Sequence, residues 1–293
     1  MKLDRVSRQQ LHQTFQEAFS DYAMDMSSLT EERLRVRCVK NGVDWGTSVG
    51  AFEGDRMVGF TLIGIDEWQG GLGAFDAATG IVPDYRGQGL AKAMFEHALP
   101  DLRAKGVGSF VLEVLKDNDP AIRAYRKTGF EISRELKCFQ LEVEALAREA
   151  DLAGPVAIRR VERDVVPGLA GSADWLPSWE NSFAAIERIP DDLIVVGAFD
   201  GETCVGSAVY TPVLNWIMTL VVRPSHRRQG VGTALMRHLV RSLPAEVEAV
   251  RLLNVDASDL GMAKFLARLG FEPLVDQYEM VRVVEDYAAL GVL

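Results

Sequence analysis

Two short segments of the chain repeat one combination of arginine, glutamine and glycine. The first is Arg86-Gly87-Gln88-Gly89-Leu90-Ala91-Lys92, and the second is Arg227-Arg228-Gln229-Gly230-Val231-Gly232-Thr233. Glycine lets backbone N–H groups converge and lets a ligand approach closely, and a helix that follows adds unpaired N–H groups and the positive end of its dipole. Each segment therefore predicts a phosphate or pyrophosphate site, with a plain strand-to-helix turn as the alternative.

Other ligand chemistries find no matching pattern. Neither loop continues into Gly-Lys-Ser/Thr or reads Gly-x-Gly-x-x-Gly, so a nucleoside triphosphate or NAD is not expected. The histidines are scattered and the 3 cysteines lie far apart, with no metal-ligand, disulfide or Ser-His-Asp spacing. No metal is therefore expected.

The elements that position the two loops occur twice in the same order. An apolar run precedes each loop and is typical of a strand, and an apolar stripe at helical spacing follows it. The stripes are formed by Leu90, Met94, Ala98 and Leu102 after the first loop and by Val231, Leu235, Leu239 and Leu243 after the second. The loops and the Gly-Phe pairs at 129–130 and 270–271 share an offset of 141 residues, and hairpin-like segments at 50–55 and 197–202 are offset by 147.

Such a register rarely arises by chance, so we interpret the chain as a duplicated domain. We expect domain 1 at residues 1–145, a linker at 146–155 and domain 2 at 156–293. Strands and helices mixed within each half predict an α/β (α+β layered) fold.

A second group of residues follows the first loop: Leu112-Glu113-Val114, Asn118-Asp119-Pro120-Ala121, Tyr125 and Gly129-Phe130. The loop pattern Pro-x-x-Arg-x-x-Gly-x-Gly/Ala, between a strand and a helix, resembles motif A of the GNAT superfamily of N-acetyltransferases, which holds the pyrophosphate of acetyl-CoA. The second group resembles motif B and is especially similar to that of the ribosomal-protein alanine N-acetyltransferases. The resemblance covers both halves and implies two tandem GNAT-like domains, each a mixed, mostly antiparallel twisted sheet flanked by helices.

The resemblance also implies acetyl-CoA as the cofactor and names the residues that would bind it. In domain 1 these are Thr79, Gly80, Ile81, Arg86, Gly87, Gln88, Gly89, Leu90, Ala91, Lys92 and Asn118. In domain 2 they are Leu220, Val221, Val222, Arg227, Arg228, Gln229, Gly230, Val231, Gly232 and Thr233. The sequence Asn118-Asp119-Pro120 is also a good start for a helix, so Asn118 is expected to cap that helix whether or not it contacts the cofactor.

Acetyl transfer requires an amine that has lost its proton, which for a lysine-like amine costs roughly 4–5 kcal/mol at pH 7. A general base lowers this barrier, and a general acid protonates the leaving thiolate. By resemblance, Tyr125 is the acid and Glu113 is the base. The alternatives are a tyrosine that packs on the sheet, an acidic residue on an exposed strand face and a water chain as base; Asp76 is a further candidate base.

In domain 2 the three corresponding motif B positions hold Asn254, Asp259 and Leu266. Leucine cannot donate a proton, so we expect domain 1 to be catalytic. Domain 2 keeps its glycine loop and is expected to bind acetyl-CoA or CoA without catalysing the same transfer; the alternative is that it acts on a distinct acceptor by water-mediated proton transfer.

Acidic and aromatic residues occupy the segments of domain 1 where an acceptor would enter: Asp21, Tyr22, Asp25, Trp45, Asp66, Glu67, Trp68 and Asp76. They suit a cationic amine through charge and cation–π attraction, with a solvated acidic surface as the alternative. In domain 2 the segment 174–179 is either an acceptor pocket or a packed entrance.

The composition sets the broad class. The chain has 293 residues, a net charge of −10 and 48% hydrophobic residues, which suits a globular protein and disfavours nucleic acid or an anionic membrane as partner. It has no apolar stretch of membrane-spanning length and no signal peptide, so a cytoplasmic location is expected. We expect a monomer or homodimer that acetylates a primary amine of a small molecule or peptide; the alternative is a non-catalytic acetyl-CoA or CoA sensor or scaffold.

Overall fold

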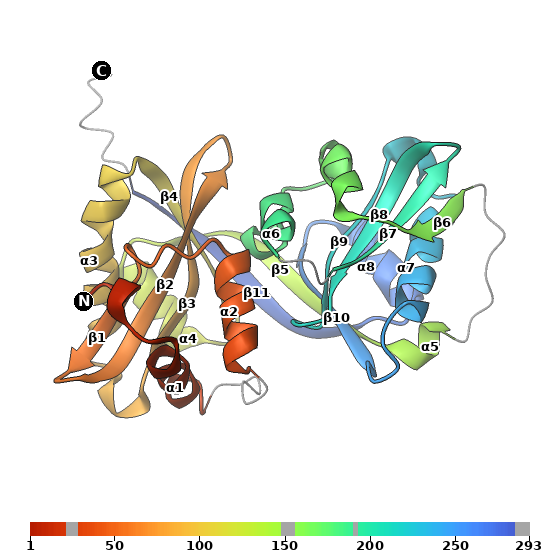
Figure 1. The fold of residues 1–293 in the computed structure, drawn as a ribbon. Helices are drawn as coiled ribbons and strands as arrows, with labels where there is room; N and C mark the ends of the chain where they lie inside the picture. The colour runs from red at the N-terminus through yellow and green to blue at the C-terminus, as the bar shows by residue number, and fades with distance from the viewer. Residues whose placement is uncertain (22–28, 148–155, 190–192, 285–293) are drawn as a thin grey trace, which may run out of the picture. The chain divides into compact units, whose positions relative to one another are not determined.

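The structure, a computed structural model, describes residues 1–21, 29–147, 156–189 and 193–284. The chain divides into two compact units: unit 1 comprises Met1–Arg134 with Tyr278–Leu293, and unit 2 comprises Glu135–Gln277. Each unit is a mixed α/β fold in which helices flank a mostly antiparallel sheet, so the predicted fold class is confirmed (Figure 1).

Unit 1 is built on the strands β1 (Val49–Glu53), β2 (Arg56–Trp68), β3 (Gly71–Ile81) and β4 (Val107–Leu115). Its helices are α1 (Arg8–Ala18), α2 (Glu31–Lys40), α3 (Leu90–Ala104) and α4 (Asp119–Lys127). β1, β2 and β3 pair antiparallel, and β3 pairs parallel with β4. This order places the first glycine loop between the end of β3 and the start of α3.

Unit 2 repeats the arrangement with β6 (Ala157–Arg160), β7 (Ile194–Asp200), β8 (Thr203–Thr211), β9 (Trp216–Val222) and β10 (Ala249–Asp256). Its helices are α5 (Val143–Ala147), α6 (Phe183–Arg188), α7 (Val231–Arg241) and α8 (Leu260–Arg268). β6 to β9 pair antiparallel in order, and β9 pairs parallel with β10. The second glycine loop accordingly lies between β9 and α7.

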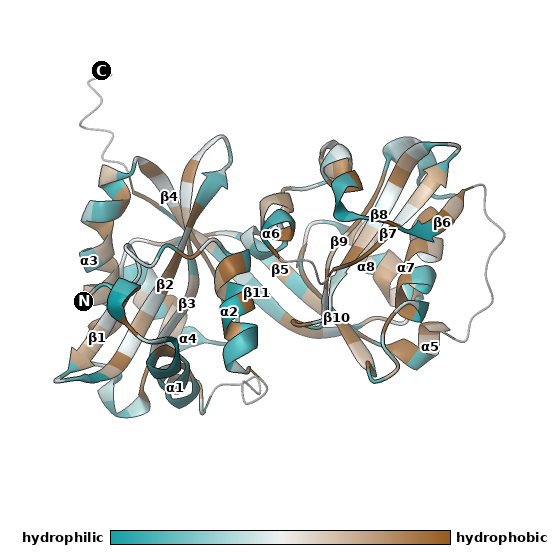
Figure 2. Cartoon of the chain, in the orientation of Figure 1, coloured by the Kyte–Doolittle hydropathy of each residue, from teal (hydrophilic) through white to brown (hydrophobic). Residues whose placement is uncertain are grey.

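Most residues of the predicted helical stripes lie in the cores, whereas Leu90 is half-buried and Leu243 follows the end of α7. Met94, Ala98 and Leu102 of α3 are buried in one cluster of unit 1, and Leu235 and Leu239 of α7 are buried in a cluster of unit 2. Each Met or Leu side chain among them contributes about 1.5–3 kcal/mol when it leaves water. In Figure 2 many residues along the strands have the colour of apolar side chains, whereas α1 is coloured mainly as hydrophilic.

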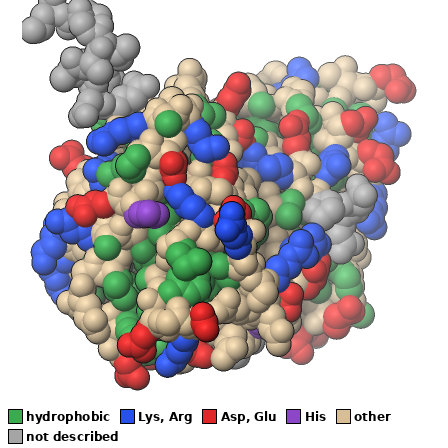
Figure 3. Space-filling view, turned by 60° about the vertical axis from the view of Figure 1, so that its left-hand side comes forward, with side chains coloured by type: hydrophobic (Ala, Val, Ile, Leu, Met, Phe, Trp, Pro, Cys, Tyr) green, Lys and Arg blue, Asp and Glu red, His purple; other side chains and the backbone are tan. Residues whose placement is uncertain are grey.

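The surface carries both signs of charge. Figure 3 shows acidic and basic side chains interspersed over one face, around a group of hydrophobic side chains. Interspersed charges give a weak long-range field on that face. In the part of the chain that the structure describes, no helix combines the length and the apolar character needed to cross a membrane.

Two long strands belong partly to each unit. β5 (Glu131–Glu142) begins in unit 1, and from Leu136 onward it pairs antiparallel with β10 of unit 2. β11 (Glu272–Val283) begins in unit 2, and its Met280 is fully buried in the core of unit 1. Each unit is thus completed by a strand end from the other half of the sequence repeat. The expected division at 146–155 follows that repeat and stays a prediction; the compact units divide the chain after Arg134 and after Gln277, and 148–155 lie outside the described residues.

A buried ion pair holds the end of β11 in unit 1. Glu279 is 2% exposed, and its carboxylate accepts hydrogen bonds from Arg134 Nη2 at 2.7 Å and Ser133 Oγ at 2.9 Å. Both donors lie on β5 just before that strand leaves unit 1. The ion pair therefore joins β5, at the point where that strand leaves unit 1, to β11, at the point where that strand enters unit 1.

Replacing Glu279 with Ala should destabilise the chain by about 3 kcal/mol, because it leaves the largely buried Arg134 guanidinium without its carboxylate. Urea denaturation measures the loss. Glu131→Ala, an exposed acid on β5 of the same unit, is the matched control and should change stability by less than about 0.5 kcal/mol. Equal effects of the two substitutions would contradict the structural role of this pair.

Candidate active site

The first glycine loop presents backbone N–H groups to open space. Gly87 and Gly89 have φ angles of 74° and 78°, in the left-handed region that favours glycine. Gly89 is the N-cap of α3 and has no side chain to cap it, and the helical bonding begins with Ala93 N–H donating to Gly89 O at 3.0 Å. A Cβ at either glycine would meet no atom within 4 Å. The N–H groups of the first turn can therefore receive an anion.

The second loop has the same backbone shape. Gly230 is the N-cap of α7 with φ 84°, and a Cβ there would also meet nothing within 4 Å. Arg228, at the position of Gly87, adopts φ 61°, which is strained for a residue with a side chain. Both loops therefore have a positive φ angle at this position, although only the first loop has glycine there.

The loop arginines bind their own chain. The Nε of Arg86 and of Arg227 each donates to the carbonyl oxygen five residues earlier, at 3.1 and 2.9 Å. Arg86 also donates both Nη groups to Asp21, each at 2.7 Å, and Arg227 donates Nη1 to Asp174 at 2.6 Å. The bonds from Arg86 lower the pKa of Asp21. Both arginines thus anchor an upstream segment to the loop, and their expected contact with the cofactor stays a prediction.

The parallel strands of unit 1 stop pairing next to this loop. The register of β3 with β4 ends at Asp76 and Leu112, although β3 continues to Ile81 and β4 to Leu115. A bulge in the β2–β3 pairing falls at the same point, where Ile63 pairs with Asp76. In unit 2 the corresponding pairing ends at Ile217, again beside a bulge. Both units therefore have a gap between two strands at the entrance of the glycine loop.

Asp76 lies buried at this gap in a polar cluster. Its side chain is 6% exposed, and Thr79 Oγ1 donates to both carboxylate oxygens at 2.9 Å. The hydroxyls of Thr79 and Thr61 are 3.0 Å apart, and Tyr125 donates its hydroxyl to Asp76 Oδ2 at 3.4 Å. Burial raises the pKa of Asp76 from 3.8 to about 7, even though the hydrogen bonds from Thr79 and Tyr125 oppose that shift. A carboxyl with this pKa can take up or release a proton near neutral pH.

Tyr125 packs through its ring and makes a polar contact through its hydroxyl. Its ring lies edge-on to Phe95 and Phe130, each with centroids 5.9 Å apart, while its hydroxyl reaches Asp76. The helix that carries it begins as expected, because Asn118 Oδ1 accepts from Ala121 N–H at 3.2 Å. The ring contacts fix where the hydroxyl can lie.

Glu113 lies on the other side of β4. Leu112 and Val114 pack in the core with α3, and successive strand side chains point to opposite faces. Asp76 pairs in register with Leu112 and meets Tyr125 on the face of α4. The structure therefore brings Tyr125 together with Asp76, whereas Glu113 points away from that pair.

Unit 2 replaces the polar cluster with apolar residues. The cross-strand pair Thr61 and Thr79 corresponds to the paired Ala208 and Leu220. Asp76 corresponds to Ile217 and Tyr125 to Leu266, under the 141-residue offset. Ala208, Ile217 and Leu266 are buried in the hydrophobic core of unit 2, and Leu220 packs against that core. The same backbone arrangement is thus built without any of the four polar side chains.

Asn254 is the unit 2 counterpart of Glu113, and its side chain forms hydrogen bonds within unit 2. It is 3% exposed with φ 60°, its Oδ1 accepts from Gln277 Nε2 at 2.9 Å, and its Nδ2 donates to Ser178 Oγ at 3.2 Å. Asp259 caps α8 by accepting from Met262 N–H at 2.8 Å, as Asn118 caps α4. These residues have structural partners of their own.

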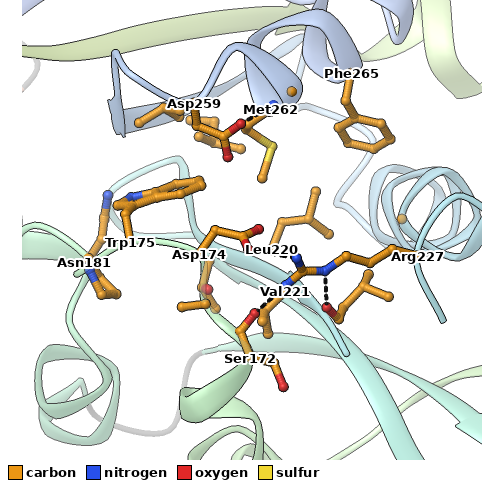
Figure 4. A pocket seen from close by; sticks show the side chains of 18 of the residues that line it. Ser172, Asp174, Trp175, Asn181, Leu220, Val221, Arg227, Asp259, Met262 and Phe265 are labelled. Atoms are coloured by element: carbon orange, nitrogen blue, oxygen red, sulfur yellow. Dashed lines mark hydrogen bonds and ion pairs between the residues drawn. The ribbon is translucent and has the colours of Figure 1, made fainter. Parts of the chain in front are cut away.

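A cavity of about 460 Å³ opens beside the glycine loop of unit 2. Its walls come from the loop, the start of α8, the end of β9 and the segment 172–181, and they include Trp175, Asn181, Leu220, Arg227, Met262 and Phe265 (Figure 4). Trp175 and Met262 point into it, whereas Trp179 is 1% exposed within the protein. Of the two tryptophans in the expected entrance segment 174–179, Trp175 lines the cavity and Trp179 is buried inside the protein.

The expected acceptor residues of unit 1 have varied surroundings. Trp68 is buried, Trp45 is 38% exposed and Asp21 is bonded to Arg86. Tyr22 and Asp25 lie outside the described residues. Asp76 is the member of this group that the structure places beside a candidate catalytic residue.

Comparisons with known proteins agree with this fold. A sequence model of the acetyltransferase (GNAT) family matches residues 8–130 and 159–271, which together make up most of the chain. The chain belongs to the acetyltransferase (GNAT) family.

Curated relatives cover parts of this GNAT chain. Streptothricin acetyltransferase of Streptomyces lavendulae is 37% identical over 83 residues, 28% of this chain and 42% of the relative. Mycothiol acetyltransferase of Corynebacterium aurimucosum is 34% identical over 94 residues, 31% of this chain and 30% of the relative. The ribosomal protein bS18 alanine N-acetyltransferase of Escherichia coli K12 is 35% identical over 89 residues, 27% and 57% of the two chains. The chain thus matches less than two thirds of each of these relatives.

Solved structures resemble the whole GNAT chain in fold. A tandem GNAT protein from the clavulanic acid biosynthesis pathway has a TM-score of 0.70 and 17% identity, covering 97% of this chain and 96% of its own. A GCN5-related N-acetyltransferase from Sphaerobacter thermophilus has a TM-score of 0.64 and 15% identity, covering 94% and 92%. The predicted tandem GNAT organisation is confirmed.

Sequence reasoning missed the threonines of the cluster in this GNAT chain. Thr79 was expected as a cofactor-binding residue, and Thr61 was not expected in the site. A signal was available, because the two repeat offsets align Thr61 with Ala208 and Thr79 with Leu220. Polar residues that become apolar in the other copy mark positions that folding does not need.

Replacing Asp76 with Asn should stabilise the chain increasingly as the pH rises. Folding raises the pKa of Asp76 from 3.8 to about 7, so between these values the folded chain holds a proton that the unfolded chain has released. The stability of the wild-type chain therefore falls with rising pH across this window. From pH 5.5 to pH 8.5 the advantage of Asp76→Asn should grow by about 2 kcal/mol, measured by urea denaturation.

The exposed Asp84→Asn in the same unit is the control for that experiment. A difference between Asp76→Asn and the wild-type chain that does not change with pH would contradict the raised pKa.

Proposed function

We propose that this chain is an acetyl-CoA-dependent N-acetyltransferase whose transfer step takes place in unit 1. The observation that carries the proposal is the buried cluster of Asp76, Thr79, Thr61 and Tyr125 beside an open glycine loop. Burying a carboxyl costs free energy, and unit 2 builds the same fold with four apolar residues in these places. The buried Asp76 carboxyl therefore costs free energy that the fold does not require, and this points to a function.

The glycine loop suits the diphosphate of acetyl-CoA. The N–H groups of Leu90, Ala91 and Lys92 have no carbonyl acceptor one turn earlier in α3, and the helix dipole adds positive potential. The backbone of Thr79, Gly80 and Ile81, next to the strand gap, would bind the pantetheine arm and polarise the thioester carbonyl. Acetyl-CoA itself supplies an activated acetyl group.

The transfer needs one acid and one base. Tyr125 would protonate the leaving thiolate, while Glu113 or Asp76 would take the proton from the amine. The amine attacks the thioester directly, so no covalent acyl-enzyme is formed. The raised pKa of Asp76 suits proton transfer near neutral pH.

The acceptor we propose is a primary amine of a small molecule or a peptide. The relatives named above include acetyltransferases of a small molecule, streptothricin, and of a ribosomal protein. Carboxylates on the acceptor side, such as Asp66 and Glu67, would attract a cationic amine.

Tyr125→Phe should reduce thiol release from acetyl-CoA by about tenfold or more, because it removes the proton donor and keeps the ring. The measurement is thiol release over a panel of amines and peptides. Gly89→Glu should abolish release, since it places a carboxylate in the predicted anion site. Gly54→Glu in the hairpin turn, also at positive φ with nothing within 4 Å, controls for backbone strain.

Two results would overturn the proposal. Binding of acetyl-CoA without release on any amine would favour the sensor or scaffold. Release that survives Gly89→Glu and is lost in Gly230→Glu would place the transfer in unit 2.

The cavity of unit 2 supports a second role, the binding of CoA without transfer. It adjoins an open glycine loop, while Ile217 and Leu266 occupy the places of the acid–base pair. Calorimetric titration with CoA should therefore find about two sites per wild-type chain and about one in Gly230→Glu. A wild-type chain that binds about one CoA, lost only in Gly89→Glu, would contradict a site in unit 2.

A further inference from the structure

We infer that Asp76, held by Thr79, positions the Tyr125 hydroxyl and returns to it the proton that it loses during acetyl transfer. This role rests on the proposed function of unit 1 and adds a proton path to it. The hydroxyl of Tyr125 donates to Asp76 Oδ2, so its oxygen is already joined to a group that can resupply a proton.

Residues on two strands and one helix keep the Asp76 carboxylate in place. Thr79 Oγ1 lies 2.9 Å from both of its oxygens, which restricts its rotation, and Thr61 on β2 in turn fixes the Thr79 hydroxyl at 3.0 Å. Leu112 of β4 lies opposite in register and is apolar. Among these neighbours, Tyr125 on α4 is the one with an ionisable side chain. The acid–base behaviour of the cluster therefore belongs to Asp76 and Tyr125.

The proton path balances. As the acceptor nitrogen bonds to the acetyl carbon and the C–S bond breaks, the sulfur takes the phenolic proton of Tyr125. The Asp76 carboxylate takes the proton that the nitrogen releases, directly or through water, and passes it to the Tyr125 oxygen. The products are an amide and a free thiol, and both side chains end in the state in which they began.

This path requires Asp76 to be ionised before transfer, so the rate rises with pH as the carboxyl loses its proton. Burial places that loss at about pH 7. The Thr79 hydroxyl stabilises the carboxylate and lowers this pKa. Its removal should move the rise in rate to higher pH.

The test is the pH dependence of kcat with acetyl-CoA and the best amine of the panel. The wild-type chain should show a rise centred near pH 7. Asp76→Asn should lower kcat about tenfold or more at pH 8 and remove that rise. Thr79→Val should move the midpoint up by about half a pH unit or more, and Thr79→Ser should restore it. Thr14→Val is the matched control, because Thr14 is 4% exposed in the same unit and donates to Gln10 O and Met57 O.

A rise that persists in Asp76→Asn, or a midpoint that does not move in Thr79→Val, would overturn the inference. Loss of activity in Tyr125→Phe with full activity in Asp76→Asn would overturn it and leave the proposed function standing. Absence of release in the wild-type chain would instead refute the proposed function.

A measurement without turnover tests the coupling itself. Carbon NMR of the labelled Asp76 carboxyl should show a midpoint near pH 7 that rises in Thr79→Val, returns in Thr79→Ser and stays in Thr14→Val. A midpoint that does not change in Thr79→Val would show that the Thr79 hydroxyl does not hold the carboxylate, and would overturn the inference.

Discussion

Both units depend on the point at which two parallel strands stop pairing. Past Asp76 in unit 1 and Ile217 in unit 2, backbone groups on the facing strand edges have no partner in the ladder. Buried backbone N–H and C=O groups must be satisfied, so such a gap is stable where water or a ligand can enter it. The glycine loop begins a few residues further along each chain segment. One backbone arrangement thus creates a slot between two strands beside an open glycine loop, where we propose that the pantetheine arm and the phosphates of acetyl-CoA bind.

The two copies of this arrangement differ in the side chains that they carry. In unit 1 the slot is lined by a carboxyl, two threonines and a tyrosine, and the carboxyl is ionised only at a free-energy cost. In unit 2 the same places hold residues that strengthen the core, beside a cavity of about 460 Å³. Duplication makes this difference visible, because one copy carries a costly polar cluster and the other has apolar residues in the same places. The comparison of the copies separates the residues that the fold needs from those that a reaction would need.

The exchange of strand ends makes each unit depend on distant sequence. Met280 completes the core that also contains Phe110, and Phe139 completes the core that contains Leu235. These contacts join parts of the chain that are far apart, which raises the cost of closing the intervening loops during folding. The ion pair of Glu279 with Arg134 joins the two strands at the place where β5 leaves unit 1 and β11 enters it. The strand gap of unit 1 therefore rests on a sheet that is complete only with the end of β11 in place.

The sequence by itself determined the duplication, the fold class, the two glycine loops and the helices that follow them. These features are local, since turn geometry, caps and apolar periodicity act within a few residues; the caps by Asn118 and Asp259 are examples. It also singled out Tyr125 and Asp76, but as separate candidates. Only the tertiary structure decided that these two meet while Glu113 points away, because that depends on strand register and on a bulge at Asp76. It likewise decided which strand ends complete each core, since alternation along β5 and β11 is the same whichever partner strand they find.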